Sequence, residues 1–175
     1  MADDGQHRTD VHTPEQRSFN MSRVRSRDTK PELQLRRGLH AVGFRYRLDV
    51  RDLPGRPDLV FPRHCAVAFV HGCFWHGHDC SLFKLPTTRT EFWTDKIQKN
   101  RARDARATTA LRAADWRVLT VWECAFRGPS RLEASEVIEA SVAFLRGLDP
   151  LSSLAGRAVS GNSDADIGGN WAAGL

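Results

Sequence analysis

The stretch CAVAFVHGCFWHGHDC, residues 65–80, joins a short apolar run to a loop crowded with potential metal ligands. The apolar run is typical of a buried β-strand. From residue 69 onward the stretch holds three histidines and two cysteines, with Phe74 and Trp75 among them. Large aromatic side chains beside such ligands indicate a zinc site, a catalytic site, a surface that grips a partner, or all three on one loop.

The composition favours one folded domain with an anionic partner. The chain has 175 residues, of which 41% are hydrophobic, and a formal net charge of +5. This length is sufficient for a single domain with its own core. Residues 17–47 hold nine Lys or Arg against two acidic residues. Such a basic segment suits nucleic acid, although a solvated surface produces the same pattern.

The sequence also predicts where the protein works. No apolar run is long enough to cross a bilayer, and the N-terminal MADDGQHRTD lacks the apolar core of a signal peptide. We therefore expect a cytoplasmic protein. In a reducing cytoplasm the four cysteines are expected to be buried thiols or metal ligands rather than disulfides.

Local patterns predict the element order α-β-β-β-α-β-α. Strands are expected at residues 44–50, 58–61, 65–70 and 116–122, and helices at residues 29–43, 90–114 and 130–147. The first and last helices open with capping-box spacing, Thr29 with Glu32 and Ser130 with Glu133. This order predicts an α/β fold, a small mixed sheet with helices on its faces. Polar composition predicts a flexible arm at residues 1–17, a domain at residues 18–148 and a disordered tail at residues 149–175.

Four residues have the types and spacing of a zinc site. Cys73, His78 and Cys80 lie on one loop, and Cys124 follows the last predicted strand. Three thiolates and one imidazole would complete a tetrahedral site with no open position, which indicates a structural zinc. The alternative is that the two distant cysteines are buried thiols and the histidine lies on the surface. Cys65 sits in the apolar run and is interpreted as a packing residue.

A second group suggests hydrolytic chemistry. Asp58 opens one predicted strand, His71 ends the next, and His76 follows on the loop. A carboxylate beside the end of a neighbouring strand suits Mg²⁺, with the histidines as acid, base or phosphate contact. The alternatives are structural, because Asp58 follows a proline in turn chemistry and Glu32 fits a capping box.

Five motifs together carry a family resemblance. LPGRPD (53–58), HGCFWH (71–76), TRTEFW (88–93), KIQKNRARD (96–104) and WRVLTVWEC (116–124) occur in this order. They resemble the very-short-patch-repair (Vsr) mismatch endonucleases over residues 18–128, and more loosely to residue 146. The resemblance implies a restriction-endonuclease-like mixed sheet flanked by helices, with a structural zinc. It also implies an enzyme that nicks one strand of duplex DNA 5′ to the T of a T:G mismatch, which arises by deamination of 5-methylcytosine.

The resemblance also assigns roles to single residues. It implies that Asp58 and the Val70 carbonyl bind a catalytic Mg²⁺, that His71 and His76 are catalytic, and that Glu32 and Asp104 are acidic residues tied to them. It implies that Cys73, His78, Cys80 and Cys124 bind Zn²⁺. The DNA contacts that we expect from the resemblance and from the basic and helical patterns are Met21, Arg23, Arg25, Arg27, Phe74, Trp75, Trp93, Lys96 and Asn100. Trp93, Lys96, Asn100 and Asp104 recur at steps that place them on one helix face.

The chain departs from the expected patterns at a few positions. Ala68 and Val70 stand where restriction endonucleases carry an acid and a lysine, and Val70 replaces a threonine that is more usual in the family. Gly77 and Asp79 replace histidines often found near the zinc ligands. Val70 therefore offers a carbonyl but no hydroxyl, and His78 is the remaining imidazole for zinc.

Three rival functions stay open at the level of sequence. They are a mismatch-binding module with little nuclease activity, a restriction-type nuclease that cuts matched sites, and a zinc-stabilised structural protein. The family suggests a monomer associated with the bacterial nucleoid, with mismatch-repair proteins and a repair DNA polymerase as partners.

Overall fold

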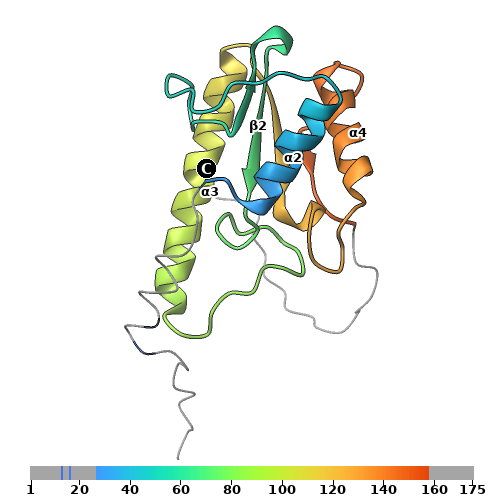
Figure 1. The fold of residues 1–175 in the computed structure, drawn as a ribbon. Coiled ribbons are helices and arrows are strands. Elements are labelled where there is room, and N and C mark those ends of the chain that lie inside the picture. The colour runs from blue at the N-terminus through green and yellow to red at the C-terminus, as the bar shows by residue number, and fades with distance from the viewer. Residues whose placement is uncertain (1–12, 14–15, 17–26, 158–175) are drawn as a thin grey trace, which may run out of the picture.

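A computed structural model of the chain describes residues 13, 16 and 27–157 (Figure 1). Three of the predicted DNA contacts, Met21, Arg23 and Arg25, lie outside the described residues. Most of the predicted N-terminal arm and the residues from 158 onward lie outside them as well. Among the described helices, none is long and apolar enough to cross a membrane.

The described strands form one mixed sheet in the order β1-β2-β3-β4. They are β1 (Leu59–Phe61), β2 (Ala66–His71), β3 (Arg117–Trp122) and β4 (Ser153–Leu154). β1 runs antiparallel to β2, while β2, β3 and β4 run parallel to one another. The register between β2 and β3 places His71 opposite Trp122. Because β2 and β3 are parallel and end side by side, their last residues lie at the same end of the sheet. The candidate functional residues lie at this end.

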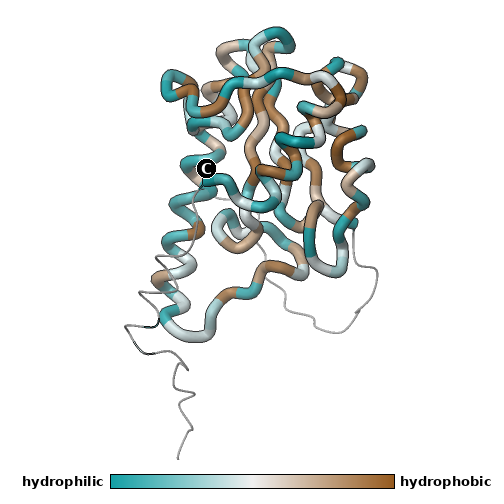
Figure 2. Tube along the Cα trace, viewed as in Figure 1, coloured by the Kyte–Doolittle hydropathy of each residue, from teal (hydrophilic) through white to brown (hydrophobic). Residues whose placement is uncertain are grey.

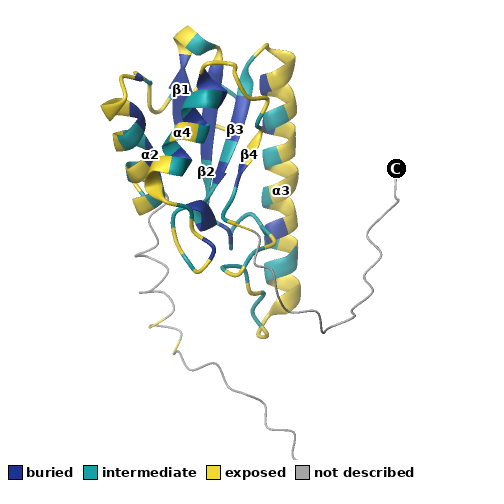
Figure 3. Cartoon of the chain, turned by 90° about the vertical axis from the view of Figure 1, so that its right-hand side faces the viewer, coloured by how far each residue is buried: buried dark blue, intermediate teal, exposed yellow. Residues whose placement is uncertain are grey.

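Three described helices cover the two faces of this sheet (Figures 1 and 3). α2 (Lys30–Ala41) and α4 (Ala134–Leu145) pack on one face, and α3 (Thr90–Ala113) crosses the other. α3 is the crossover that parallel strands β2 and β3 require. The predicted α/β class with a mixed sheet and flanking helices is confirmed.

The alternation of strand side chains divides the core into two clusters. Leu35 and Leu39 of α2 pack with Phe61 and Leu119 on one face of the sheet. Leu111 of α3 packs with Val67 and Val118 on the other. Figure 2 shows the hydrophobic residues concentrated along the strands between the two helical layers. Burial of both sheet faces explains why the strands read as nearly continuous apolar runs.

The first helix begins as its capping pattern predicts. Thr29 is the N-cap, and its side-chain oxygen accepts a hydrogen bond from the Glu32 N–H at 3.5 Å. Gly43 follows the helix at a φ of 94°, a conformation that glycine adopts without strain. The last helix begins later than predicted. Its capping box joins Glu133 and Glu136, because Ser130 is buried and its carbonyl accepts the Arg157 N–H at 2.7 Å.

Two other local predictions are wrong. Residues 44–50 do not form a strand, and this segment contributes one isolated bridge between Arg47 and Val60. Asp49 in this segment has a φ of 58°, which turns the chain away from the extended path. Cys65 is exposed in a left-handed conformation before β2 begins, so it is not a packing residue of the strand.

The sheet continues past residue 148, where the sequence analysis begins the tail. β4 pairs with the end of β3 and buries Leu154 against the core. A two-residue strand between Gly-, Ser- and Ala-rich segments has too little periodicity to be recognised from sequence. The described chain from residue 149 to 157 therefore belongs to the folded unit.

Candidate functional site

Asp58 and Val70 lie next to each other although twelve residues separate them. The antiparallel pairing of β1 with β2 brings the residue before β1 beside the end of β2. One carboxylate oxygen of Asp58 accepts a hydrogen bond from the Val70 N–H at 2.7 Å. The carboxylate thus contacts the neighbouring strand, which argues against a role limited to its own turn.

His71 and His76 form a stacked pair beside this carboxylate. Their ring centroids lie 3.8 Å apart and the ring planes differ by 6°. His76 Nδ1 is hydrogen-bonded to an Asp104 carboxylate oxygen at 2.5 Å, and Asp104 lies on α3. The three side chains are close enough for their polar atoms to act on one group.

These residues line one cleft of about 230 Å³. The cleft collects every residue to which the sequence analysis assigned a catalytic or magnesium role: Glu32, Asp58, Val70, His71, His76 and Asp104. Arg56 and Arg103 also line it and were not singled out from sequence. Two guanidinium groups beside the carboxylates make the cleft suitable for an anionic substrate.

Burial controls the ionisation of the cleft. It raises the pKa of Asp58 to about 6. The charge of Glu32 also raises this pKa, while the hydrogen bond from the Val70 N–H lowers it without cancelling the effect of burial. Burial, together with the charge of the neighbouring His76, lowers the pKa of His71 to about 4. For Asp104, burial alone would raise the pKa, but the hydrogen bond and charge of His76 outweigh it and leave the pKa below its ordinary value. A carboxyl whose anionic form is disfavoured by burial gains from a cation beside it.

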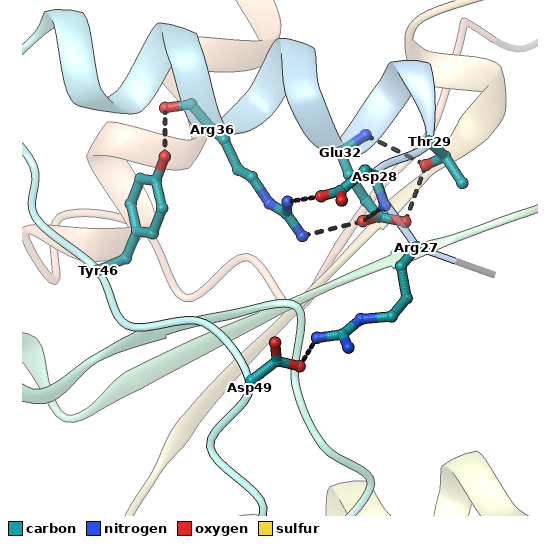
Figure 4. Close-up of polar contacts among 7 residues, drawn as sticks. All are labelled: Arg27, Asp28, Thr29, Glu32, Arg36, Tyr46 and Asp49. Carbon is teal, nitrogen blue, oxygen red and sulfur yellow. Dashed lines mark hydrogen bonds and ion pairs between the residues drawn. The ribbon is translucent and has the colours of Figure 1, made fainter. Parts of the chain in front are cut away.

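Glu32 is held at the edge of this cleft by α2 (Figure 4). Its side chain is almost fully buried and forms an ion pair with Arg36 at 3.0 Å. Its carboxylate accepts the Asp28 N–H at 3.0 Å and the Thr29 hydroxyl at 2.9 Å. Glu32 therefore stabilises the start of α2, the structural role that its capping-box spacing suggested, and it also lines the cleft.

The second ligand cluster joins the loop after β2 to the residues that follow β3. Cys73, His78, Cys80 and Cys124 each offer one ligand atom, and these atoms lie within 4.8 Å of one another. A zinc ion with bonds of 2.0–2.3 Å would hold tetrahedral ligand atoms about 3.5 Å apart. His78 Nδ1 lies 3.6 Å from Cys124 Sγ, which matches this spacing.

Without a metal, burial favours the uncharged forms of these ligands, and a bound cation would replace the thiol protons. Burial raises the pKa values of Cys73 and Cys124, so as free thiols both would remain protonated. Burial lowers the pKa of His78, which favours the neutral imidazole that binds metals. The set of donors therefore suits Zn²⁺ in chemistry and in spacing.

An aromatic cluster joins the same loop to α3. The centroid of the Phe74 ring lies 5.1 Å from that of Trp75 and 5.3 Å from that of Trp93, which is on α3. Lys96 Nζ lies 5.4 Å from the Trp75 ring and 5.6 Å from the Trp93 ring. Sequence analysis missed Phe92, which is 44% exposed and adjoins the same cluster. Its exposure on the first turn of a helix could not be read from its neighbours.

Two other predicted DNA contacts have intramolecular partners. Asn100 donates a hydrogen bond from its side-chain amide to the Trp75 carbonyl at 2.8 Å. Arg27 forms an ion pair with Asp49, and both side chains are largely exposed (Figure 4). Asn100 therefore ties the aromatic loop to α3, while Arg27 lies at the rim of a neighbouring pocket.

Sequence analysis also missed Trp122. It ends β3, and its ring stacks on His78 at 4.1 Å with an interplanar angle of 18°. Its ring lies 5.4 Å from that of His71. Only the pairing of β2 with β3 places this tryptophan between the two ligand clusters.

Comparison with known proteins first defines the class. A nicking enzyme from Xanthomonas oryzae, V.XorIIP, is 51% identical over 126 residues, which cover 72% of this chain and 93% of that protein. A second nicking enzyme, V.NmeAIP from Neisseria meningitidis, is 43% identical over 116 residues, covering 66% of this chain and 83% of that protein. The chain is thus similar to DNA-nicking enzymes.

The family follows from two further findings. The family model of the DNA mismatch endonuclease Vsr matches residues 9–82. The DNA mismatch endonuclease Vsr of Escherichia coli is 48% identical over 130 residues, covering 74% of this chain and 83% of that protein. The chain belongs to the Vsr family of DNA mismatch endonucleases.

Proposed function

We propose that the protein is a mismatch repair endonuclease that nicks one strand of duplex DNA 5′ to the T of a T:G mismatch. The observation that carries the proposal is the end of β2 with the loop that follows it, which place His71 and His76 in the cleft and carry the neighbouring pair Phe74 and Trp75. One rigid segment can therefore probe the base stack and hold a phosphate at the same time. Mismatches of this kind arise by deamination of 5-methylcytosine.

Asp58 and the Val70 carbonyl are the proposed ligands of a Mg²⁺ ion. Magnesium prefers oxygen ligands and keeps several waters, so one carboxylate and one carbonyl are a suitable protein contribution. The Val70 N–H holds one carboxylate oxygen and thereby orients the other. A bound Mg²⁺ would supply charge stabilisation at the scissile phosphodiester and lower the pKa of a bound water.

His76 is the proposed acid–base or phosphate-contacting residue. Its Nδ1 is hydrogen-bonded to Asp104, and this contact fixes the plane of the ring and leaves Nε2 for the substrate. His71 stacks against it, and its low pKa keeps this ring neutral at physiological pH. Glu32 and Arg36 at the edge of the cleft support the local charge balance.

The proposed fold family and zinc site follow from the same arrangement. A mixed sheet with the cleft at one end, the order of its strands and the flanking helices support a restriction-endonuclease-like core. A Zn²⁺ held by Cys73, His78, Cys80 and Cys124 would be structural, because four protein ligands leave no position for substrate. It would attach the loop to the end of β3.

The aromatic cluster is the proposed mismatch sensor. Phe74, Trp75 and Trp93 can insert between base pairs, and unstacking costs less where pairing is already poor. Lys96 lies above these rings, where its charge would meet the phosphates or base edges. We expect the protein to act as a monomer in the bacterial cytoplasm, at the nucleoid, with mismatch-repair proteins and a repair polymerase as later partners.

A closed circular DNA with one T:G mismatch tests this function. In Mg²⁺ the wild type should convert it to the nicked circle, and a strand-resolved gel should place the cut 5′ to the T. Asp58→Ala should abolish nicking and retain duplex binding, whereas Asp52→Ala, which changes an exposed acid six residues earlier, should nick normally. Binding without nicking by the wild type would support a mismatch-binding module, and cutting of both strands of matched DNA would support a restriction-type nuclease.

A further inference from the structure

Trp122 touches both ligand clusters. One face of its indole ring stacks on His78, with ring centroids 4.1 Å apart. The rings of His71 and His76 meet it nearly at right angles, with centroids at 5.4 Å and 6.5 Å and interplanar angles of 72° and 73°. The orientation of this one side chain therefore bears on the candidate zinc ligand and on the stacked histidine pair together.

The orientation of Trp122 is set from outside the cleft by β4. Trp122 Nε1 donates a hydrogen bond to Ser153 Oγ at 2.9 Å. The indole N–H is the only polar group of a tryptophan side chain, so this bond is its only directional anchor. The parallel pairing of β4 with β3 and the burial of Leu154 hold Ser153 in place. Figure 3 shows β4 beside β3 at the edge of the sheet.

The chain after β4 reaches the zinc cluster itself. The Gly156 N–H points to Cys124 Sγ, with a nitrogen-to-sulfur distance of 3.4 Å. A Cβ at this position would lie 2.5 Å from the Ser130 carbonyl oxygen and 2.6 Å from the Cys124 carbonyl oxygen. Both obstacles are backbone atoms, so only glycine allows this close approach.

The next residue anchors the segment. The Arg157 N–H donates to the Ser130 carbonyl at 2.7 Å, and its guanidinium group contacts both carboxylate oxygens of Glu136 at 2.8 Å. Residues 153–157, the strap, are therefore fixed at both ends, by β4 pairing and by the start of α4.

We propose that the strap positions the two ligand clusters, with Ser153 and Trp122 as positioning residues for the histidine pair and Gly156 as the hydrogen-bond donor to a zinc-bound thiolate. The first part rests on the proposed function, because it assumes that His71 and His76 take part in catalysis. The second part concerns zinc binding alone. Outer partners of metal ligands typically change metal affinity or activity by about 10–100-fold when they are lost.

A double-mutant cycle tests the first part. Ser153→Ala and Trp122→Phe each remove one partner of the same hydrogen bond, and each should lower the single-turnover nicking rate on T:G duplex by about tenfold. The Kd for the duplex should not change. The double variant should be no slower than the slower single variant, because coupled partners are not additive. The control is Ser152→Ala, since the Ser152 carbonyl alone, and not its exposed side chain, pairs with Thr120.

Two results would overturn the first part. One is a Ser153→Ala rate equal to that of Ser152→Ala. The other is an additive double variant, which would show that Trp122 and Ser153 act separately. A general loss of stability would lower the melting temperature and the affinity for DNA together, whereas a positioning role changes the rate at constant affinity.

Zinc release from DNA-free protein tests the second part. Transfer of zinc to a colorimetric chelator should be about tenfold or more faster from Gly156→Ala than from wild type. Arg157→Ala removes the anchor of the strap without creating a clash, so it should accelerate release in the same direction and by less. The Co²⁺-substituted proteins should show a changed thiolate-to-metal absorption band. Wild-type release rates in both variants would overturn this part, and since no nicking is measured, its failure is separate from failure of the proposed function.

Discussion

Single contacts decide the chemistry of the cleft, and the pair formed by His76 and Asp104 is the clearest of them. The carboxylate lies on α3, 28 residues along the chain from the imidazole, and it holds Nδ1 at 2.5 Å. A histidine whose one nitrogen is fixed presents the other nitrogen in a defined direction. The proposed roles of both residues depend on this geometry.

Replacing Asp104 by Asn should therefore slow nicking more than it weakens binding. An amide can still bond to the ring, but it no longer stabilises positive charge on the imidazole, so we expect a loss of about 10–1,000-fold in the single-turnover rate. Asp95→Asn is the matched control, because Asp95 lies on the same helix and, among the described residues, forms its ion pair with the exposed Lys99. Equal rates for the two variants would remove Asp104 from the mechanism.

A substitution of Trp75 tests the proposed insertion of aromatic side chains between base pairs. Stacking on a base contributes about 1–3 kcal/mol, so Trp75→Ala should lower nicking of T:G duplex by about 10–100-fold. Non-specific binding depends on phosphate contacts and should keep its salt dependence. We would measure the melting temperature, salt-dependent binding and nicking on this variant. A parallel loss of all three would show that Trp75 is a packing residue.

At the scale of elements, the loop from residue 72 to 80 carries His76 of the cleft together with Phe74 and Trp75. Of its residues, Cys73 is the one that is fully buried. Contacts from other elements hold the loop. Glu123 accepts the Cys73 N–H at 3.2 Å, and Asn100 donates to the Trp75 carbonyl. The ligand cluster joins the loop to Cys124 beyond β3.

Loss of one proposed zinc ligand should therefore release the loop. We expect about one zinc per chain in the wild type and none in Cys80→Ser, with a fall in melting temperature on the order of 10 °C. The control is Cys65→Ser, because Cys65 is exposed and lies outside the cluster. Metal analysis and thermal melting measure both quantities, and a folded, active wild type without zinc would contradict the assignment.

At the scale of the whole molecule, the sheet carries the site and the two helical layers hold the sheet. Leu111 of α3 is fully buried against Val67 and Val118, so α3 and the residues it presents to the cleft are fixed by packing on this face. The opposite layer, formed by α2 and α4, positions Glu32 and the anchor of the strap.

Leu111→Ala should consequently lower the free energy of unfolding by about 2–5 kcal/mol, because it removes a buried side chain and leaves a cavity. Leu148→Ala should change it by less than about 0.5 kcal/mol, since Leu148 is 75% exposed. Chemical denaturation at constant zinc measures both. A similar loss for the two variants would mean that the packing of α3 contributes little to stability.

Much of the local structure follows from neighbouring residues. The start of α2 at Thr29, the apolar strands and the long helix from residue 90 each depend on capping groups or periodicity within about one turn or strand. The candidate ligands were also recognisable, because Cys, His and Asp types at close spacing carry chemical information of their own. The strand predicted at residues 44–50 and the cap predicted at Ser130 failed because a positive φ and a distant carbonyl contact overrode the local pattern.

The sequence by itself thus determined the α/β class, most element positions, and the residue types available for zinc and for hydrolysis. The family resemblance implied that Asp58 and Val70 share a site and that Asp104 is tied to the histidines, but no local pattern showed how these residues meet. The tertiary structure alone decided that Trp122 meets both His78 and Ser153. The physical reason is the range of the interactions. Capping and periodicity act between residues a few positions apart, whereas these contacts depend on strand register and on the path of the crossover helix, which are set by packing of the whole core.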